Sequence, residues 1–178
     1  MGEVKRARLL EKHARLERER RAFLDRVASV APDRLRAAPA PHRWSVLQIV
    51  EHLALAEESV LASLRDEAGP RGRTRRLRHR LASLLVRALL RSPIRVPAPS
   101  RDMLPTGEDS LPAIRVRWDD LMGRLGSYLR DAEAGRLGEA PFRHPVTGPL
   151  DAAGALALTE VHRRRHVLQI DRLLGGDW

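Results

Sequence analysis

Apolar residues recur at three- and four-residue steps along most of this chain, and this spacing constrains the fold more than any other feature. Four stretches show the period: 3–30, 45–68, 110–134 and 151–174. In the first, the recurring positions are Leu9, Leu16, Phe23, Val27 and Val30. No stretch shows the alternation of a half-buried strand. The pattern therefore predicts an all-α protein with four long amphipathic helices.

Cap and turn residues bound these predicted helices. Ser45 is a favourable N-cap, and Gln48 follows three residues later, as in a capping box. Ser110 is placed to begin the third helix in the same way. Residues 31–43, with three prolines, and residues 136–149 have little periodicity and are predicted to be loops.

An insert of residues 71–109 separates the second predicted helix from the third. Its first part, 71–91, carries leucines on one face and arginines elsewhere, which predicts an extra basic amphipathic helix. Its second part, 92–109, is rich in proline and irregular. The whole chain, 1–178, is therefore expected to form a single domain: a four-helix bundle with an added basic helix.

Composition limits the chemistry available to such a bundle. Aromatic residues make up only 3% of the chain, so the core must be built from Leu, Ala and Val. There is no cysteine, which excludes disulfides, iron–sulfur clusters and thiolate zinc sites. Any metal ion must be held by His, Asp or Glu. Because no segment resembles a signal peptide or a membrane span, we expect a cytoplasmic protein that is not transmembrane.

The chain is strongly basic, with a formal net charge of +10. Such a charge is compatible with binding to nucleic acid or to an anionic membrane surface. The alternative is a general bias toward arginine, because the arginines are spread along the chain and interleaved with acidic residues. Both interpretations stay open from the sequence.

Two histidines lie one turn apart in the last predicted helix. An α-helix turns by about 100° per residue, which places His166 about 40° from His162, within the apolar stripe. The same arithmetic directs Arg163 and Arg164 toward the flank and the solvent. Two inward imidazoles at this spacing can chelate one metal ion. The alternative is a pair of core histidines hydrogen-bonded to their neighbours.

A third ligand would strengthen the metal interpretation, and His52 is the best candidate. It lies midway along the second helix, at the border of an apolar stripe, where it could face the last helix. Three histidines from two helices would leave open positions on the ion, which is the pattern of catalytic rather than structural sites.

Two further residues are candidates for catalysis. Glu57 falls near the centre of the apolar face of the second helix, where a proton-transfer carboxylate and a salt bridge to an arginine are equally plausible. His144, in a predicted loop, could lie at the mouth of the site. The candidates for a general base are Glu57, Glu160 and His144, in that order. His13, His42 and His79 lie in charged surroundings and are predicted to be on the surface.

Two segments resemble the DinB-like (YfiT-like) metalloenzyme superfamily. The segments are HRWSVLQIVEHLALAEE and HPVTGPLDAAGALALTEVHRRRHVLQIDRLL, which contain the motifs WS followed by His, HPxxG and HxxxHxxQI. The resemblance implies an up-down-down-up four-helix bundle that often forms a homodimer. It also implies a divalent metal, commonly nickel or zinc, held by His52, His162 and His166. The long basic insert departs from the usual pattern of the family.

The resemblance implies chemistry on a small-molecule substrate, because some relatives transfer low-molecular-weight thiols such as bacillithiol or mycothiol. We therefore expect a divalent ion (Zn, Ni or Fe) that activates water or such a thiol, in a thiol S-transferase or a hydrolase. Arg71, Arg73, Arg75 and Arg76 would form a positive rim that favours acidic partners. The alternatives are a non-catalytic stress-related scaffold and a basic module that binds nucleic acid or anionic membranes.

Overall fold

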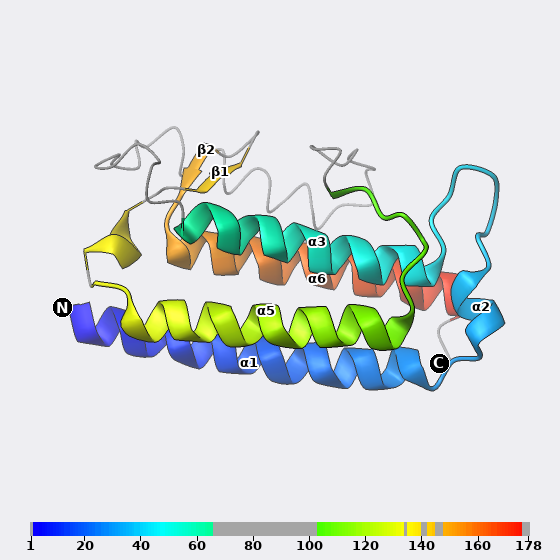
Figure 1. Cartoon of the computed structure of the whole chain (residues 1–178), viewed down its shortest axis with the longest axis horizontal. Coiled ribbons are helices and arrows are strands. Elements are labelled where there is room, and N and C mark those ends of the chain that lie inside the picture. Colours follow the sequence, from blue (N-terminus) through cyan, green and yellow to red (C-terminus); the bar gives the residue numbers. More distant parts are fainter. Residues whose placement is uncertain (1, 66–102, 134, 140–141, 145–147, 176–178) are drawn as a thin grey trace.

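Four long helices lie in two layers, with α3 and α6 packed over α1 and α5 (Figure 1). The computed structural model describes residues 2–65, 103–133, 135–139, 142–144 and 148–175. The long helices are α1 (Gly2–Ala28), α3 (Val46–Arg65), α5 (Leu111–Asp131) and α6 (Ala152–Leu174). The short elements are α2 (Pro32–Arg36), the 3-10 helix η2 (Arg136–Gly138), β1 (Phe142–His144) and β2 (Gly148–Leu150).

The helices run up, down, down and up. Figure 1 shows α1 and α6 running in one direction and α3 and α5 in the other. Helix α3 contacts α5 and α6, and α1 contacts the same two helices, so α1 and α3 lie diagonally across the bundle. The predicted all-α, up-down-down-up four-helix bundle is confirmed. Among the residues that the structure describes, no helix has the length and apolar character needed to cross a membrane.

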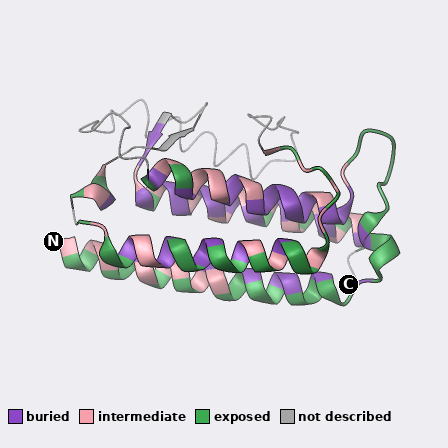
Figure 2. Ribbon diagram, in the orientation of Figure 1, coloured by how far each residue is buried: buried purple, intermediate pink, exposed green. Residues whose placement is uncertain are grey.

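The predicted apolar stripes form one common core. All five recurring residues of the first predicted helix are buried, and so are the apolar residues of α5 at the same steps: Ile114, Trp118, Leu121, Leu125 and Leu129. Figure 2 shows that α3 and α6 are buried over much of their visible surface, whereas α1 and α5 expose many residues. Because each buried Leu, Val or Phe side chain contributes about 1.5–3 kcal/mol, these stripes supply the main driving force for the bundle.

Side-chain caps begin the helices where the sequence predicts them. Ser45 Oγ accepts the Gln48 amide at 3.2 Å, and Gln48 Oε1 accepts the Ser45 amide at 3.0 Å, which completes the capping box. Ser110 caps α5, and Asp151 caps α6 with an amide hydrogen bond of 2.9 Å. Gly175, at φ 86°, ends α6 in the left-handed conformation that glycine adopts without strain.

We expect Ser45→Ala to lower the free energy of unfolding by about 1 kcal/mol, because the Gln48 amide loses its acceptor. Ser63→Ala is the matched control. The Ser63 hydroxyl only donates to the Ser59 carbonyl within α3, and alanine has the higher helix propensity. Urea titration followed by circular dichroism measures both variants. Equal unfolding midpoints for the two variants would contradict the capping role.

Two segments predicted to be loops contain short regular elements. Helix α2 begins at Pro32, whose fixed φ suits the first turn, and it buries Leu35 against the core. The predicted loop 136–149 contains η2, β1 and most of β2; the two strands pair antiparallel, with Arg143 opposite Pro149. Strands of three residues are too short to show a period of two. The predicted end of the second helix and the basic helix 71–91 lie outside the described residues.

Candidate metal centre

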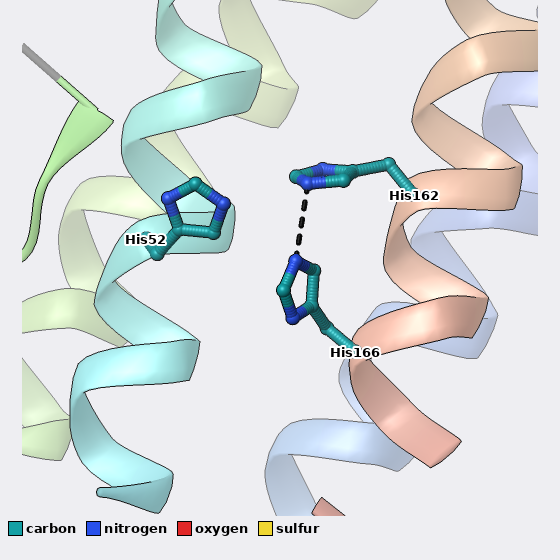
Figure 3. Close-up of side chains that lie close together, drawn as sticks. All are labelled: His52, His162 and His166. Carbon is teal, nitrogen blue, oxygen red and sulfur yellow. Dashed lines mark hydrogen bonds between the residues drawn. The ribbon is translucent and has the colours of Figure 1, made fainter. Parts of the chain in front are cut away.

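The three predicted ligands converge inside the bundle. His52 projects from α3 toward His162 and His166 on α6, as Figure 3 shows. One ring nitrogen from each histidine lies within 4.8 Å of the corresponding atoms of the other two. The convergence follows from the direct packing of α3 against α6 and from the four-residue spacing that places two rings on one side of α6. The predicted juxtaposition is therefore confirmed.

The three rings meet edge to face. Their centroids are 5.2 Å apart for His52 and His162, 5.1 Å for His52 and His166, and 4.7 Å for the α6 pair. The interplanar angles of 77°, 72° and 88° exclude parallel stacking. The three rings therefore come together without stacking, and one edge nitrogen of each lies within 4.8 Å of those of the other two.

The spacing of the nitrogens suits a single ion. The Nε2 atoms of His162 and His166 are 3.2 Å apart. Two imidazole nitrogens bound tetrahedrally to zinc at about 2.0–2.1 Å lie about 3.3 Å from each other. A divalent ion that accepts neutral imidazole therefore fits this donor set, and three protein ligands leave a coordination position open.

Hydrogen bonds outside the cluster orient two of the rings. His52 Nδ1 lies 2.7 Å from the Met103 carbonyl oxygen, and His166 Nδ1 lies 2.9 Å from Gln169 Oε1. Because a carbonyl oxygen only accepts, each Nδ1 must carry the proton and donate it, which leaves the lone pair on Nε2. Such partners typically fix the tautomer and orientation of histidine ligands to metals.

The surroundings also keep these two imidazoles neutral. Burial lowers the pKa of His52, and the hydrogen bond to the Met103 carbonyl opposes this shift only in part. Burial, followed by the charges of His52 and Arg165, lowers the pKa of His166 to about 4, although the bond to Gln169 acts in the opposite direction. A metal ion would therefore meet unprotonated nitrogens at neutral pH.

An aromatic side chain covers one side of the cluster. The ring of Trp44, which is half-buried, lies 4.7 Å from the ring of His52, at an interplanar angle of 46°. Trp44 directly precedes Ser45, the N-cap of α3, so the start of α3 places the Trp44 ring next to that of His52. This apolar ring covers one side of the His52 imidazole.

Glu57 lies in a buried polar network one to two turns beyond His52 on α3. Arg163 donates from Nε and Nη2 to its Oε1 at 3.1 and 2.8 Å, and from Nη2 to its Oε2 at 2.8 Å. Trp118 Nε1 donates to Oε2 at 2.9 Å, and Arg163 also donates to the Leu16 carbonyl. All four long helices therefore meet in this network, and the contacts favour the salt-bridge alternative for Glu57. Its acid–base role stays a prediction.

The predicted exposure of Arg163 is wrong, because its side chain is buried. Helix α6 packs against both α1 and α3, so its buried arc is wider than the histidine face alone. The buried stripe runs at three- and four-residue steps through Leu156, Thr159, Arg163, His166 and Ile170. His162 lies at its edge and is half-buried, whereas Arg164 is exposed as predicted.

The other candidates have separate surroundings. Glu160 pairs with Lys12 and Arg15 of α1. Burial raises its pKa, but the hydrogen bonds and the charges of these two cations together outweigh burial and lower it. The backbone of His144 lies in β1, opposite Gly148, but its side chain lies outside the described part of the chain, so its catalytic role stays a prediction.

The predicted surface histidines differ among themselves. His42 is exposed. His13 is half-buried, and its Nε2 lies 3.0 Å from the Met122 carbonyl oxygen. His79 lies outside the described residues.

Sequence reasoning missed the Met103 carbonyl, for which no local signal exists. It also missed the orienting role of Gln169, which the three-residue step from His166 could have indicated.

Fold and site together define a class: an up-down-down-up helical bundle with three inward histidines from two helices, spaced to hold one divalent ion. The chain belongs to the DinB superfamily, whose family model matches residues 15–170. No curated protein and no solved structure matches the chain in comparable searches.

Proposed function

We propose that this protein is a divalent-metal-dependent enzyme that activates water or a low-molecular-weight thiol, as a thiol S-transferase or a hydrolase. The observation that carries the proposal is the grouping of three imidazole nitrogens, one from each of His52, His162 and His166. Membership of the DinB superfamily supports it. The ion would be zinc, nickel or ferrous iron, because all three accept neutral imidazole.

The ligand set determines what such a site can do. A divalent ion held by three neutral imidazoles keeps its full charge and makes a coordinated water or thiol acidic near neutral pH. The chain itself orients His52 through Met103 and His166 through Gln169, so that Nε2 of each ring is directed inward. Trp44 provides an apolar wall against which the organic part of a small-molecule substrate can pack.

The metal content of tag-free protein tests the foundation of the proposal. We expect about one equivalent of a divalent metal per chain, because the three imidazoles form one site. Elemental analysis after purification, and again after reconstitution with zinc or nickel and desalting, measures it. A content below about a tenth of an equivalent after reconstitution would remove the basis for a metalloenzyme.

A second assay separates the two reaction types. In thiol transfer, the sulfur of mycothiol or bacillithiol forms a bond to the carbon of a chlorinated acceptor, chloride leaves, and the thiol proton passes to solvent. In hydrolysis, the oxygen of water forms the new bond to an ester or amide carbon, the bond from that carbon to the alcohol or amine breaks, and a proton from the water passes to the leaving group. Turnover by the metal-loaded protein, compared with His162→Ala, assigns the type. Equal background rates for both proteins would favour a non-catalytic scaffold.

The location and the oligomeric state of the protein are part of the same proposal. We expect a cytoplasmic homodimer, and light scattering during size-exclusion chromatography measures the oligomeric state. The arginines predicted to form a positive rim, and the basic helix of the nucleic-acid or membrane alternative, lie outside the described residues. Retention on heparin that is lost on deleting residues 71–91 would support that alternative.

A further inference from the structure

A buried carboxylate directly precedes the first metal ligand. Glu51 is almost completely buried on α3, at 2% exposure. Its carboxylate accepts three hydrogen bonds: from the Thr106 amide and the Thr106 hydroxyl at 3.0 Å each, and from the Gly107 amide at 2.9 Å. A carboxylate that accepts and never donates matches three such donors. Glu51 therefore holds a segment far away in the sequence against α3.

The same segment orients the metal centre. Only three residues before Thr106, the Met103 carbonyl accepts the Nδ1 proton of His52. Two adjacent side chains of α3 thus hold one short stretch of backbone, residues 103–107, at both of its ends. The position of the Met103 carbonyl, and with it the orientation of the His52 ring, depends on where this stretch lies.

Two further features hold the C-terminal end of the stretch in place. The Glu108 amide donates to the Thr106 hydroxyl oxygen at 3.2 Å, which closes a local turn. Gly107 has a positive φ of 78°, and a Cβ at this position would lie 3.1 Å from Gln48 Nε2. The backbone therefore packs closely on α3, and Glu51 supplies the acceptors for its otherwise unpaired amides.

We infer that Glu51 is a positioning residue for the metal centre. It contacts none of the three histidine rings in the described contacts. Glu51 fixes the position of residues 103–107 and so the position of the Met103 carbonyl. This carbonyl holds the proton of His52 on Nδ1 and directs Nε2 toward His162 and His166. The inference rests on the proposed function for the identity of the ligand, a divalent ion, but the orientation of His52 can be measured without one.

The first arm of the test measures zinc affinity by competition with a chelating indicator. Glu51→Gln keeps the size of the side chain but brings an amide NH2 group against the donors of Thr106 and Gly107. We expect binding about 10-fold weaker at unchanged stoichiometry, because the loss of outer hydrogen-bond partners typically costs metal sites 10–100-fold in affinity. Glu108→Gln removes the same charge from the exposed residue that directly follows this stretch, and we expect wild-type affinity.

A further variant separates position from charge. Thr106→Val removes the hydroxyl bond to Glu51 and the acceptor of the Glu108 amide, but keeps the Thr106 amide bond to Glu51 and every charge. We expect a smaller loss of zinc affinity than for Glu51→Gln, in a protein whose helix content by circular dichroism is that of the wild type. Because this variant leaves the buried face of α3 unaltered, it also tests the inference if Glu51→Gln fails to fold.

The second arm needs no metal. Nitrogen-15 spectra of the histidine side chains report which nitrogen of His52 carries the proton. We expect the Nδ1–H form in the metal-free wild type and in Glu108→Gln, and a mixture of tautomers once the Glu51 contacts are weakened. Wild-type zinc affinity and an unchanged Nδ1–H signal in both Glu51→Gln and Thr106→Val would overturn the inference. A wild type that binds no metal would refute the proposed function, and the tautomer signal would still decide the role of Glu51.

Discussion

Replacing Glu57 with alanine is expected to lower the free energy of unfolding by about 3–5 kcal/mol, the typical cost of leaving one member of a buried ion pair without its partner. The Arg163 guanidinium would stay buried without a counter-charge, and Trp118 Nε1 would lose its acceptor. Urea unfolding followed by circular dichroism measures the loss.

The adjacent Glu58→Ala is the control for Glu57→Ala. Glu58 is partly exposed, and its contact with Arg124 is 3.8 Å long. Such surface pairs contribute about 0–1 kcal/mol, so we expect a change near the lower end of that range. If Glu57→Ala were no less stable than Glu58→Ala, the buried network would have no structural role.

A double variant addresses the untested catalytic role of Glu57. Replacing buried ion pairs with apolar residues of similar volume is often neutral or stabilising. Glu57→Met combined with Arg163→Met should therefore recover much of the stability that Glu57→Ala loses. If this folded, metal-loaded variant still turns over substrate, the role of Glu57 is structural. If turnover is lost at full metal content, the result supports proton transfer by Glu57.

Replacing His166 with alanine is expected to abolish the stabilisation that added metal gives. An ion that binds only the folded state, at a free concentration 100-fold above its Kd, stabilises the wild type by about 2.7 kcal/mol. His166→Ala removes one of the three rings of the cluster, together with its bond to Gln169, so the same concentration should give almost no gain. Thermal unfolding with and without zinc measures the difference.

The comparison is made within each protein, so the cost of the substitution itself cancels. His42→Ala is the matched control, because His42 is exposed and outside the cluster. We expect it to keep the full gain of the wild type. An undiminished gain in His166→Ala would show that zinc binds elsewhere and would reject the three-histidine centre.

The architecture could be predicted because its signals are local. Periodic apolar residues define each buried face. The polar residues that directly precede three of the helices, Ser45, Ser110 and Asp151, cap them. The pairing of His162 with His166 also follows from helix geometry, because both lie within one turn. The addition of His52 required only that its helix pack against α6, as it does in the bundle.

The remaining features depend on neighbours that a local pattern does not contain. The burial of Arg163 depends on Glu57, 106 positions earlier in the chain, and on the contact of α6 with two helices. The orientation of His52 depends on the Met103 carbonyl, 51 positions away. A backbone carbonyl has no side-chain signature, so no residue type at position 103 could have indicated it.

Helix α6 carries both core residues and the two histidines of the metal centre, so folding and metal binding depend on different side chains of the same helix. Arg163 and Ile170 point into a core completed by the other long helices, while His166 lies in the same buried stripe and His162 at its edge. Since that core draws its cohesion from leucines and a charged pair, assembly need not wait for an ion. Removal of the metal by a chelator should therefore leave the apoprotein folded, whereas small zinc domains unfold without their metal.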